Sequence, residues 1–283
     1  MRQPYSELPN SVVSAVNGID YAYRDTGGHD GAAPLVLLQH FRGNLDSWDP
    51  ALIDALAASR RVITVDNAGV GGSAGTTPDT IEQMARDAIA FVTALELAQV
   101  DLLGFSIGSF VAQEIALRRP ALVRRLVLAS SAPKGAAGMH GWTPAVIGAV
   151  GTPRTSPEAY LSVFFAASEA SQQAGREALG RMYARKEDRD TATDWATREA
   201  QYDAVCAWGI PDHSALERLS AIEMPVFVAN GDSDPMILPR YSHLLAGLIA
   251  QAQIKIYPDS AHGFLFQHHA EFAGDVEAFL SAP

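Results

Sequence analysis

A serine between two glycines, in Gly104-Phe105-Ser106-Ile107-Gly108, has the spacing of a displayed nucleophile. The pattern alone is weak, because the motif is short and the chain holds 23 glycines. Its context strengthens it, since an apolar run typical of a buried strand precedes the serine and an amphipathic helical pattern follows it. Small neighbours would let the backbone turn sharply while the hydroxyl points outward. We therefore predict that Ser106 is a nucleophile.

Ile107 would supply a hydrogen-bond donor at the same turn. It begins a predicted helix over 107–119, and the first N–H groups of a helix have no partner inside it. The positive end of the helix dipole lies there as well. We expect the Ile107 N–H to bind the oxygen that becomes negative when Ser106 attacks a carbonyl group.

A neutral serine hydroxyl needs a neighbouring base, and the base needs a third group that orients it. His262 follows the last predicted strand, in Ala261-His262-Gly263-Phe264. Asp232 and Asp234 follow the strand before it, in the segment 230–235. The chain thus offers a candidate base and two candidate acids in separate loops.

Three further titratable residues lie close to these in the sequence. Asp259 stands in a Pro258-Asp259-Ser260 turn, where an aspartate commonly bonds its own backbone. His268 and His269 compete with His262 as the base, but they fit the start of the final helix. The eight histidines show neither a HExxH motif nor paired Cys/His spacing, so we expect no metal.

The glycine-rich segment Asp66-Asn67-Ala68-Gly69-Val70-Gly71-Gly72-Ser73 has some of the spacing of a dinucleotide-binding loop. Such a loop would enter a helix at the first strand–helix unit, with a third glycine in register. This segment instead follows the fourth predicted strand and runs into another loop. We therefore expect no nucleotide and no other cofactor.

The elements that must position these residues alternate between strand and helix. A hairpin over 12–25 turns at Asn17-Gly18. Short apolar runs then predict strands buried on both faces, at 35–39, 62–66, 100–105, 126–130, 225–231 and 254–257. Amphipathic patterns predict helices between or after them, at 80–97, 107–119, 239–248 and 269–280. The sequence predicts an α/β fold with an eight-stranded, mostly parallel, doubly wound sheet and an antiparallel N-terminal hairpin.

The alternation lapses after the sixth strand. Helical patterns over 168–185 and 191–207 occur there without a strand. We predict a core formed by 1–132 and 213–283 and a helical cap formed by 133–212. The cap would cover the C-terminal edge of the sheet, where open α/β folds bind ligands.

Aromatic residues of the predicted cap suggest an apolar pocket, although aromatic side chains in helices more often serve packing. They are Trp142, Phe164, Phe165 and Trp195. We select Trp142 and Phe164 as candidate substrate contacts.

Composition narrows the class of protein. The chain has 283 residues, of which 48% are hydrophobic and 19% charged, so it can bury a large core. A net charge of -11 disfavours a nucleic-acid partner. No apolar run approaches the roughly 18 to 20 residues of a membrane span. The first seven residues lack the pattern of a secretory signal, and Cys206 is the sole cysteine, which favours the cytoplasm. The oligomeric state, including a homo-oligomer, stays open.

Taken together, these motifs resemble the α/β-hydrolase superfamily, specifically its cap-bearing esterases, cofactor-free haloperoxidases or perhydrolases, and carbon–carbon bond hydrolases. The order serine, acid, histidine is the order of that family. Its Gly-x-x-Asp-Pro pattern implies Asp234 as the acid and leaves Asp232 as the alternative. Its base follows the last strand, which implies His262. The segment 66–73 is similar to the family's Asp-x-x-Gly-x-Gly-x-Ser turn.

The loop after the third strand carries a further part of the resemblance. Gln39-His40-Phe41-Arg42-Gly43 stands where the family has His-Gly-aromatic-Pro-Gly. The resemblance implies that Phe41 offers the second oxyanion N–H. His40 departs from the family's glycine and would line the pocket, either touching the substrate or only holding the loop. The same two alternatives apply to Arg42.

The resemblance implies a serine hydrolase that cleaves a small carboxylic ester or lactone through an acyl-enzyme on Ser106. A perhydrolase or haloperoxidase and a carbon–carbon hydrolase are alternatives that would use the same serine. A non-catalytic ligand-binding protein on this fold is the alternative from another class. The sequence does not identify the substrate.

Overall fold

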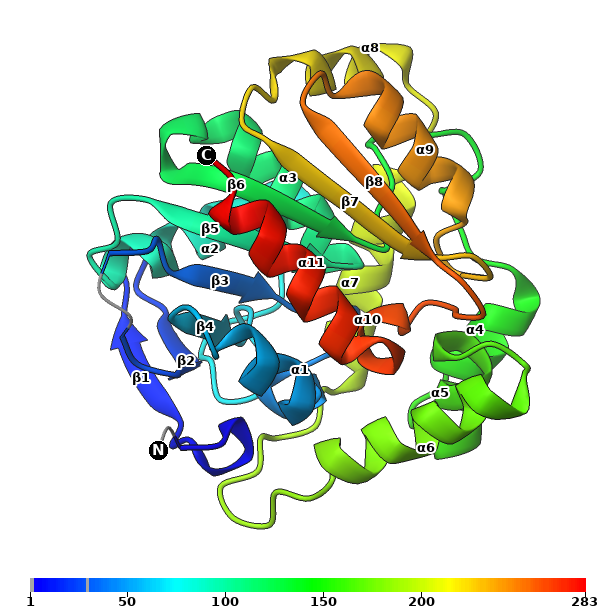
Figure 1. The fold of residues 1–283 in the computed structure, drawn as a ribbon, viewed down its shortest axis with the longest axis horizontal. Helices are drawn as coiled ribbons and strands as arrows, with labels where there is room; N and C mark the ends of the chain where they lie inside the picture. Colours follow the sequence, from blue (N-terminus) through cyan, green and yellow to red (C-terminus); the bar gives the residue numbers. More distant parts are fainter. Residues whose placement is uncertain (1–2, 29–30) are drawn as a thin grey trace.

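The computed structural model describes residues 3–28 and 31–283. Residues 1 and 2, part of the N-terminal segment considered above, lie outside the described residues. The centre is one eight-stranded sheet in the order β1-β2-β4-β3-β5-β6-β7-β8 (Figure 1). The strands are β1 Ser11–Ser14, β2 Asp20–Asp25, β3 Leu35–Leu38, β4 Val62–Val65, β5 Val100–Phe105, β6 Val123–Ala129, β7 Val226–Gly231 and β8 Ala252–Tyr257.

The N-terminal strands are the antiparallel part of the sheet. β1 pairs with β2, and β2 pairs with β4, both antiparallel. Gly18 makes the hairpin turn possible with a φ of 78°, which a side-chain-bearing residue adopts at a cost. The other strand pairs are parallel. The predicted eight-stranded, mostly parallel sheet with an antiparallel hairpin is confirmed.

The central strands explain the unalternating apolar runs. Every residue of β3, β4, β5 and β7 is buried, because helices cover both faces of the sheet. Figure 1 shows α1 and α11 in front of the sheet and α2 and α3 behind it. The helices outside the β6–β7 connection are α1 Pro50–Leu56, α2 Ile81–Ala94, α3 Ile107–Arg118, α9 Pro239–Leu248, α10 Phe264–Gln267 and α11 His269–Ser281.

The connection between β6 and β7 is helical, as expected for the segment called the cap above. It contains α4 Pro144–Val150, α5 Pro157–Phe164, α6 Glu169–Met182, α7 Trp195–Trp208 and α8 His213–Glu217. Short 3-10 turns occupy Tyr5–Glu7, Leu45–Ser47, Pro120–Leu122 and Arg218–Ala221. A two-point contact joins this connection to the body of the protein, since the Arg181 guanidinium donates to both Asp49 oxygens at 2.8 and 2.6 Å.

Some element ends differ from the predicted ones for local reasons. The helix predicted over 191–207 begins only at Trp195, because the Asp194 side chain accepts from Thr197 N and caps it. The strand predicted from 126 begins at Val123, and its Arg124 pairs with the buried Asp101 at 2.6 Å. This ion pair stabilises Arg124 within the strand. The sequence analysis predicts a strand that begins only after this charged residue.

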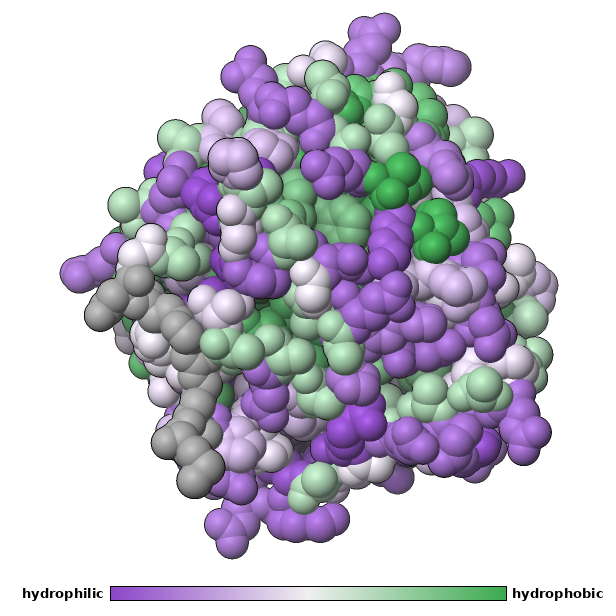
Figure 2. Space-filling model, in the orientation of Figure 1, coloured by the Kyte–Doolittle hydropathy of each residue, from purple (hydrophilic) through white to green (hydrophobic). Residues whose placement is uncertain are grey.

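The face of the molecule that Figure 2 shows is mostly hydrophilic, with small apolar groups. Figure 2 shows one strongly hydrophobic group over β8, the edge strand on which Ile254 is exposed. Within the described residues, no helix is both long and apolar enough to cross a membrane.

Candidate active site

Ser106 occupies a strained turn between β5 and α3. Its φ of 58° and ψ of -124° lie outside the regions that a serine prefers. A Cβ on Gly104 would lie 2.3 Å from the carbonyl oxygen of Gly108. A Cβ on Gly108 would lie 2.2 Å from the carbonyl oxygen of Leu38. Both glycines are therefore required by the close approach of α3 to the central strands.

Three predicted residues from separate loops meet at this turn. His262 Nε2 lies 2.9 Å from Ser106 Oγ, and His262 Nδ1 lies 2.8 Å from Asp234 Oδ2. A carboxylate only accepts, so Nδ1 carries the proton and Nε2 is left to accept from the serine hydroxyl. All three side chains are buried. This chain of hydrogen bonds can pass a proton from a hydroxyl to an imidazole.

The two candidate acids have different partners. Asp234 uses its second oxygen to accept from the N–H groups of Met236 and Ile237, at 2.8 and 3.0 Å, which fixes the carboxylate. Asp232 instead accepts from the N–H groups of Asp259 and Ser260, at 2.9 and 3.2 Å. The structure brings Asp234 to the histidine and uses Asp232 to hold the turn that precedes it.

The other nearby candidates face elsewhere. His268 precedes α11 and its Nε2 lies 3.2 Å from Pro258 O, while His269 is the first residue of that helix. Asp259 has a φ of 49°, and its carboxylate accepts from Ser168 Oγ at 2.6 Å. The partner of the Asp259 carboxylate thus lies in the segment before α6. The sequence analysis instead expects Asp259 to bond to the backbone of its own turn.

Two backbone N–H groups near the nucleophile turn are the predicted oxyanion donors. Ile107 is the first residue of α3, and Phe41 lies in the loop after β3. Across residues 3–28 and 31–283, neither N–H has a hydrogen-bond acceptor. Both predicted donors are therefore free to bind an oxygen anion.

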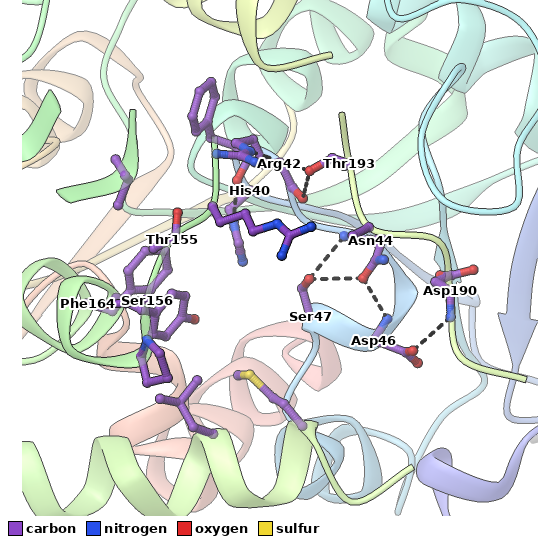
Figure 3. Close-up of a pocket in the computed structure, with 18 of the residues that line it drawn as sticks. His40, Arg42, Asn44, Asp46, Ser47, Thr155, Ser156, Phe164, Asp190 and Thr193 are labelled. Carbon is purple, nitrogen blue, oxygen red and sulfur yellow. Dashed lines mark hydrogen bonds between the residues drawn. The ribbon is translucent and has the colours of Figure 1, made fainter. Parts of the chain in front are cut away.

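The loop that carries Phe41 is bonded to the helical connection. Arg42 N–H donates to Gln201 Oε1 at 2.6 Å, and Thr193 Oγ1 donates to Arg42 O at 3.2 Å (Figure 3). The Arg42 guanidinium donates to the carbonyl oxygens of Thr152 and Pro153, at 2.7 and 2.9 Å. Arg42 thus clamps this loop to three separate segments. Its backbone φ is 61°, a conformation that costs energy for a residue other than glycine.

A cavity of about 730 Å³ lies beside the triad, since His262 is one of its lining residues. Figure 3 shows this cavity with labelled residues of its wall. His262, Met236, His40, Phe41 and Phe164 line the end near the triad. Polar side chains line other parts of the wall, among them Asn44, Asp46, Asp190 and Thr193. The volume falls within the range of small-molecule sites.

Two of the three predicted substrate contacts, His40 and Phe164, therefore face the cavity. Trp142 does not line it; its ring instead packs edge-on against Phe41, with ring centroids 4.9 Å apart. Ser106 does not line the cavity either, and 2% of its surface is exposed. A direct substrate contact by Trp142 stays a prediction.

The glycine-rich turn 66–73 is built around a carboxylate. Asp66 accepts from the N–H groups of Leu45 and Gly72, at 2.9 and 3.0 Å. A Cβ on Gly71 would lie 2.3 Å from the Asp66 carboxylate, which accounts for a glycine there. Among the residues described, no three His, Cys, Asp or Glu side chains gather where they could hold a metal.

A second acidic residue reaches this turn from the helical connection. Asp190 Oδ2 also accepts from Leu45 N–H, at 3.0 Å, so the two carboxyl groups converge on one donor. Burial raises the pKa of Asp66 well above its usual range and also raises the pKa of Asp190. Sequence reasoning missed Asp190 and Gln201, because neither stands in a motif and each contact joins distant segments.

Comparison with known proteins places this chain in a family. A family model described as alpha/beta hydrolase fold matches residues 33–269. The solved structure of an alpha/beta hydrolase fold protein from Chitinophaga pinensis is 36% identical, covers 99% of this chain and 100% of that one, and has a TM-score of 0.92.

Two curated relatives are similar over most of both chains. One is a pimeloyl-[acyl-carrier protein] methyl ester esterase of Aliivibrio salmonicida, 26% identical over 87% of this chain and 91% of the relative. The other is a non-heme chloroperoxidase of Streptomyces lividans, 26% identical over 96% and 99%. With the family model covering most of its length, this chain is an enzyme of the alpha/beta hydrolase family.

Proposed function

We propose that this enzyme hydrolyses a small carboxylic ester or lactone, with Ser106 as nucleophile, His262 as base and Asp234 as the acid that orients the base. The single observation that carries the proposal is the unbroken chain of hydrogen bonds from Asp234 through His262 to Ser106, at 2.8 and 2.9 Å. The cavity of about 730 Å³ on which His262 opens supports a small-molecule substrate.

In the first step, Ser106 Oγ bonds to the carbonyl carbon while His262 Nε2 takes its proton. Asp234 stabilises the imidazolium that results. The carbonyl oxygen becomes negative and is bound by the N–H groups of Phe41 and Ile107. Each such donor is typically worth about 100- to 1,000-fold in rate.

The intermediate then collapses, and the leaving oxygen takes the proton from His262. The acyl group remains on Ser106. Water attacks this acyl-enzyme with His262 again as the base, which releases the carboxylic acid and returns the proton to the serine. The same residues serve both halves of the reaction.

We further propose that residues 133–212 act as the cap that selects the substrate. Residues 150–164 and 179–194 supply more than half of the cavity wall, and the core supplies the triad. Substrate choice would thus depend largely on the cap, and bond cleavage on the core.

A second candidate is perhydrolysis, in which hydrogen peroxide replaces water as acyl acceptor. The similarity to a non-heme chloroperoxidase over nearly the whole chain favours it. It needs the same acyl-enzyme, so the two functions differ only in the second half of the reaction.

The test is a screen of esters, lactones and amides of varied acyl length with the wild type and Ser106→Ala. Peracid formation and cleavage of a vinylogous diketone are measured in parallel. We expect turnover of esters or lactones and a loss of about 10⁴-fold or more in Ser106→Ala. Turnover of another class with esters and lactones untouched would show that the proposal is wrong.

A further inference from the structure

His40 carries a hydrogen-bond acceptor that the triad chemistry does not use. Its Nδ1 lies 2.9 Å from the carbonyl oxygen of Phe41. A carbonyl oxygen cannot donate, so Nδ1 holds the ring proton. Burial lowers the pKa of His40 to about 3, which keeps the imidazole neutral near neutral pH. Nε2 is therefore a lone-pair acceptor.

That acceptor is buried and has no partner. His40 is 5% exposed, and within the described part of the chain no group donates to its Nε2. An unpaired buried polar atom typically costs about 1 to 3 kcal/mol. The residue nevertheless lines the large cavity, and Figure 3 shows the ring pointing into it. A bound molecule with a donor group could supply the missing hydrogen bond.

The position of His40 places such a donor close to the reacting carbonyl. His40 and His262 both pack against Phe105, with ring centroids 5.3 and 5.1 Å away. Both also pack against Phe164, each at 5.2 Å. His40 directly precedes Phe41, whose N–H is the proposed oxyanion donor. The acceptor and the triad base therefore share one corner of the cavity.

A role in supporting the loop does not explain the unpaired Nε2 of His40. The bond from Nδ1 to Phe41 O already anchors the ring to the backbone. A role only in holding the loop does not explain why the second ring nitrogen is buried without a partner among the described residues, because such an atom is costly when unpaired.

We propose that His40 Nε2 accepts a hydrogen bond from an O–H or N–H group that the substrate carries next to its scissile carbonyl. This inference rests on the proposed ester hydrolysis and specifies the substrate as an ester with a 2-hydroxy or 2-acylamino group. His40 is then a specificity-determining residue, and the reaction still proceeds through Ser106.

Matched substrates test the donor directly. Ethyl mandelate and ethyl 2-methoxyphenylacetate differ in one O–H, and ethyl N-acetylglycinate and ethyl N-acetylsarcosinate differ in one N–H. The enzymatic rate for each ester is divided by the rate of hydrolysis of the same ester by hydroxide. We expect kcat/KM to favour the donor-bearing member of at least one pair by about tenfold or more, because a polar pocket atom left unpaired disfavours the other member.

Two variants assign the preference to His40. His40→Phe removes the acceptor and keeps a ring, so the preference within each pair should fall to about one. This ratio cancels any effect that the lost bond to Phe41 O has on both members of a pair. His40→Gln retains an acceptor and should keep part of the preference. Thermal unfolding shows whether each variant is folded.

A binding measurement makes the test independent of turnover. In the Ser106→Ala background, calorimetry with mandelamide and 2-methoxyphenylacetamide tests the O–H arm, and N-acetylglycinamide and N-acetylsarcosinamide test the N–H arm. The donor-bearing amide of the preferred pair should bind about tenfold more tightly, and adding His40→Phe should remove the difference.

Equal binding within both amide pairs, or a preference that persists in His40→Phe, overturns the inference and leaves a water as the partner of Nε2. Ester hydrolysis without any preference would refute the role of His40 and leave the proposed function standing. If no ester is hydrolysed, the proposed function fails, and the calorimetry still decides whether His40 binds a donor.

Discussion

The nucleophile turn and the loop that carries Phe41 contribute to the same site, but they are held in different ways. The turn is packed backbone against backbone, since a Cβ on Gly108 would lie 2.2 Å from Leu38 O. The Ser106 N–H also donates to Ala129 O at 2.9 Å, inside the sheet. The Phe41 loop is held by side chains and carbonyl groups of the cap segment, which meet it at Arg42.

Because of this difference, mutations in the two regions should have different effects. Damage to the nucleophile turn must disturb the sheet itself, because the glycines lie where strands and helix touch. A mutation that breaks the contacts of Arg42 should leave the sheet intact and displace only the Phe41 N–H, one of the two proposed oxyanion donors. Mutations in the helical connection between β6 and β7 should thus alter the rate without changing the fold.

The largest effect is expected at the acid of the triad, on the core side of the comparison. Asp234→Asn should lower kcat by about 10⁴-fold, because the histidine loses the carboxylate that selects its tautomer. Asp232→Asn should lower it by less than about tenfold, since Asp232 holds only the adjacent turn. Similar kcat values for the two variants would contradict the assignment of the acid.

A glycine substitution tests the rigidity of the nucleophile turn. Gly108→Ala should lower the free energy of unfolding by about 3 kcal/mol or more, because the new methyl group meets backbone atoms. The control is Gly148→Ala in α4, where nothing lies within 4 Å of the new Cβ. That variant should be stabilised by about 0.5 to 1 kcal/mol, as alanine is the better helix former. Urea unfolding measures the free energy of unfolding of both variants. Equal values would contradict the predicted rigidity of the nucleophile turn.

A glutamine in α7 tests the clamp on the loop. Gln201→Ala removes the acceptor of Arg42 N–H, so we expect kcat to fall by about tenfold as the Phe41 donor shifts. Gln173→Ala, at an exposed position of α6, is the control and should leave kcat unchanged. An unchanged kcat in Gln201→Ala would mean that the clamp does not position the donor.

The smallest effect concerns the carboxyl pair that joins the turn 66–73 to the cap. Burial raises the pKa of Asp66 and Asp190, so the folded protein keeps a proton that the unfolded chain has lost. Stability from this pair is complete below about pH 4, the unfolded value, and is lost as pH rises through the raised pKa.

Asp190→Asn isolates the contribution of that proton. The asparagine oxygen can still accept from Leu45 N–H, but the asparagine does not titrate, so Asp66 is the one titrating group of the pair that remains. The melting temperature of the variant should therefore fall less than that of the wild type between about pH 4 and pH 8. Parallel curves for the two proteins would contradict a raised pKa of Asp190.

Sequence reasoning reached the fold and the three triad positions for a common physical reason. Parallel strands end at one edge of the sheet, so residues that follow β5, β7 and β8 must lie near one another. That is how Ser106, Asp234 and His262 come together from distant parts of the chain.

Contacts between residues that stand in no motif cannot be predicted from the sequence. The bond from Arg42 to Gln201 joins residues 159 apart, and nothing in the predicted helix marks that glutamine. The helices α4 and α5 were also missed, since each is short and its pattern covers only two turns. Side-chain contacts between separately folded segments depend on packing, which periodicity does not encode.

An activated serine is the central claim, and a fluorophosphonate probe tests it most directly. The probe bonds covalently only to a serine whose hydroxyl a neighbouring base has activated. The wild type should be labelled on the peptide that contains Ser106, and Ser106→Ala should not be labelled at all. Absence of labelling in the folded wild type, or labelling that survives in Ser106→Ala, would contradict the triad.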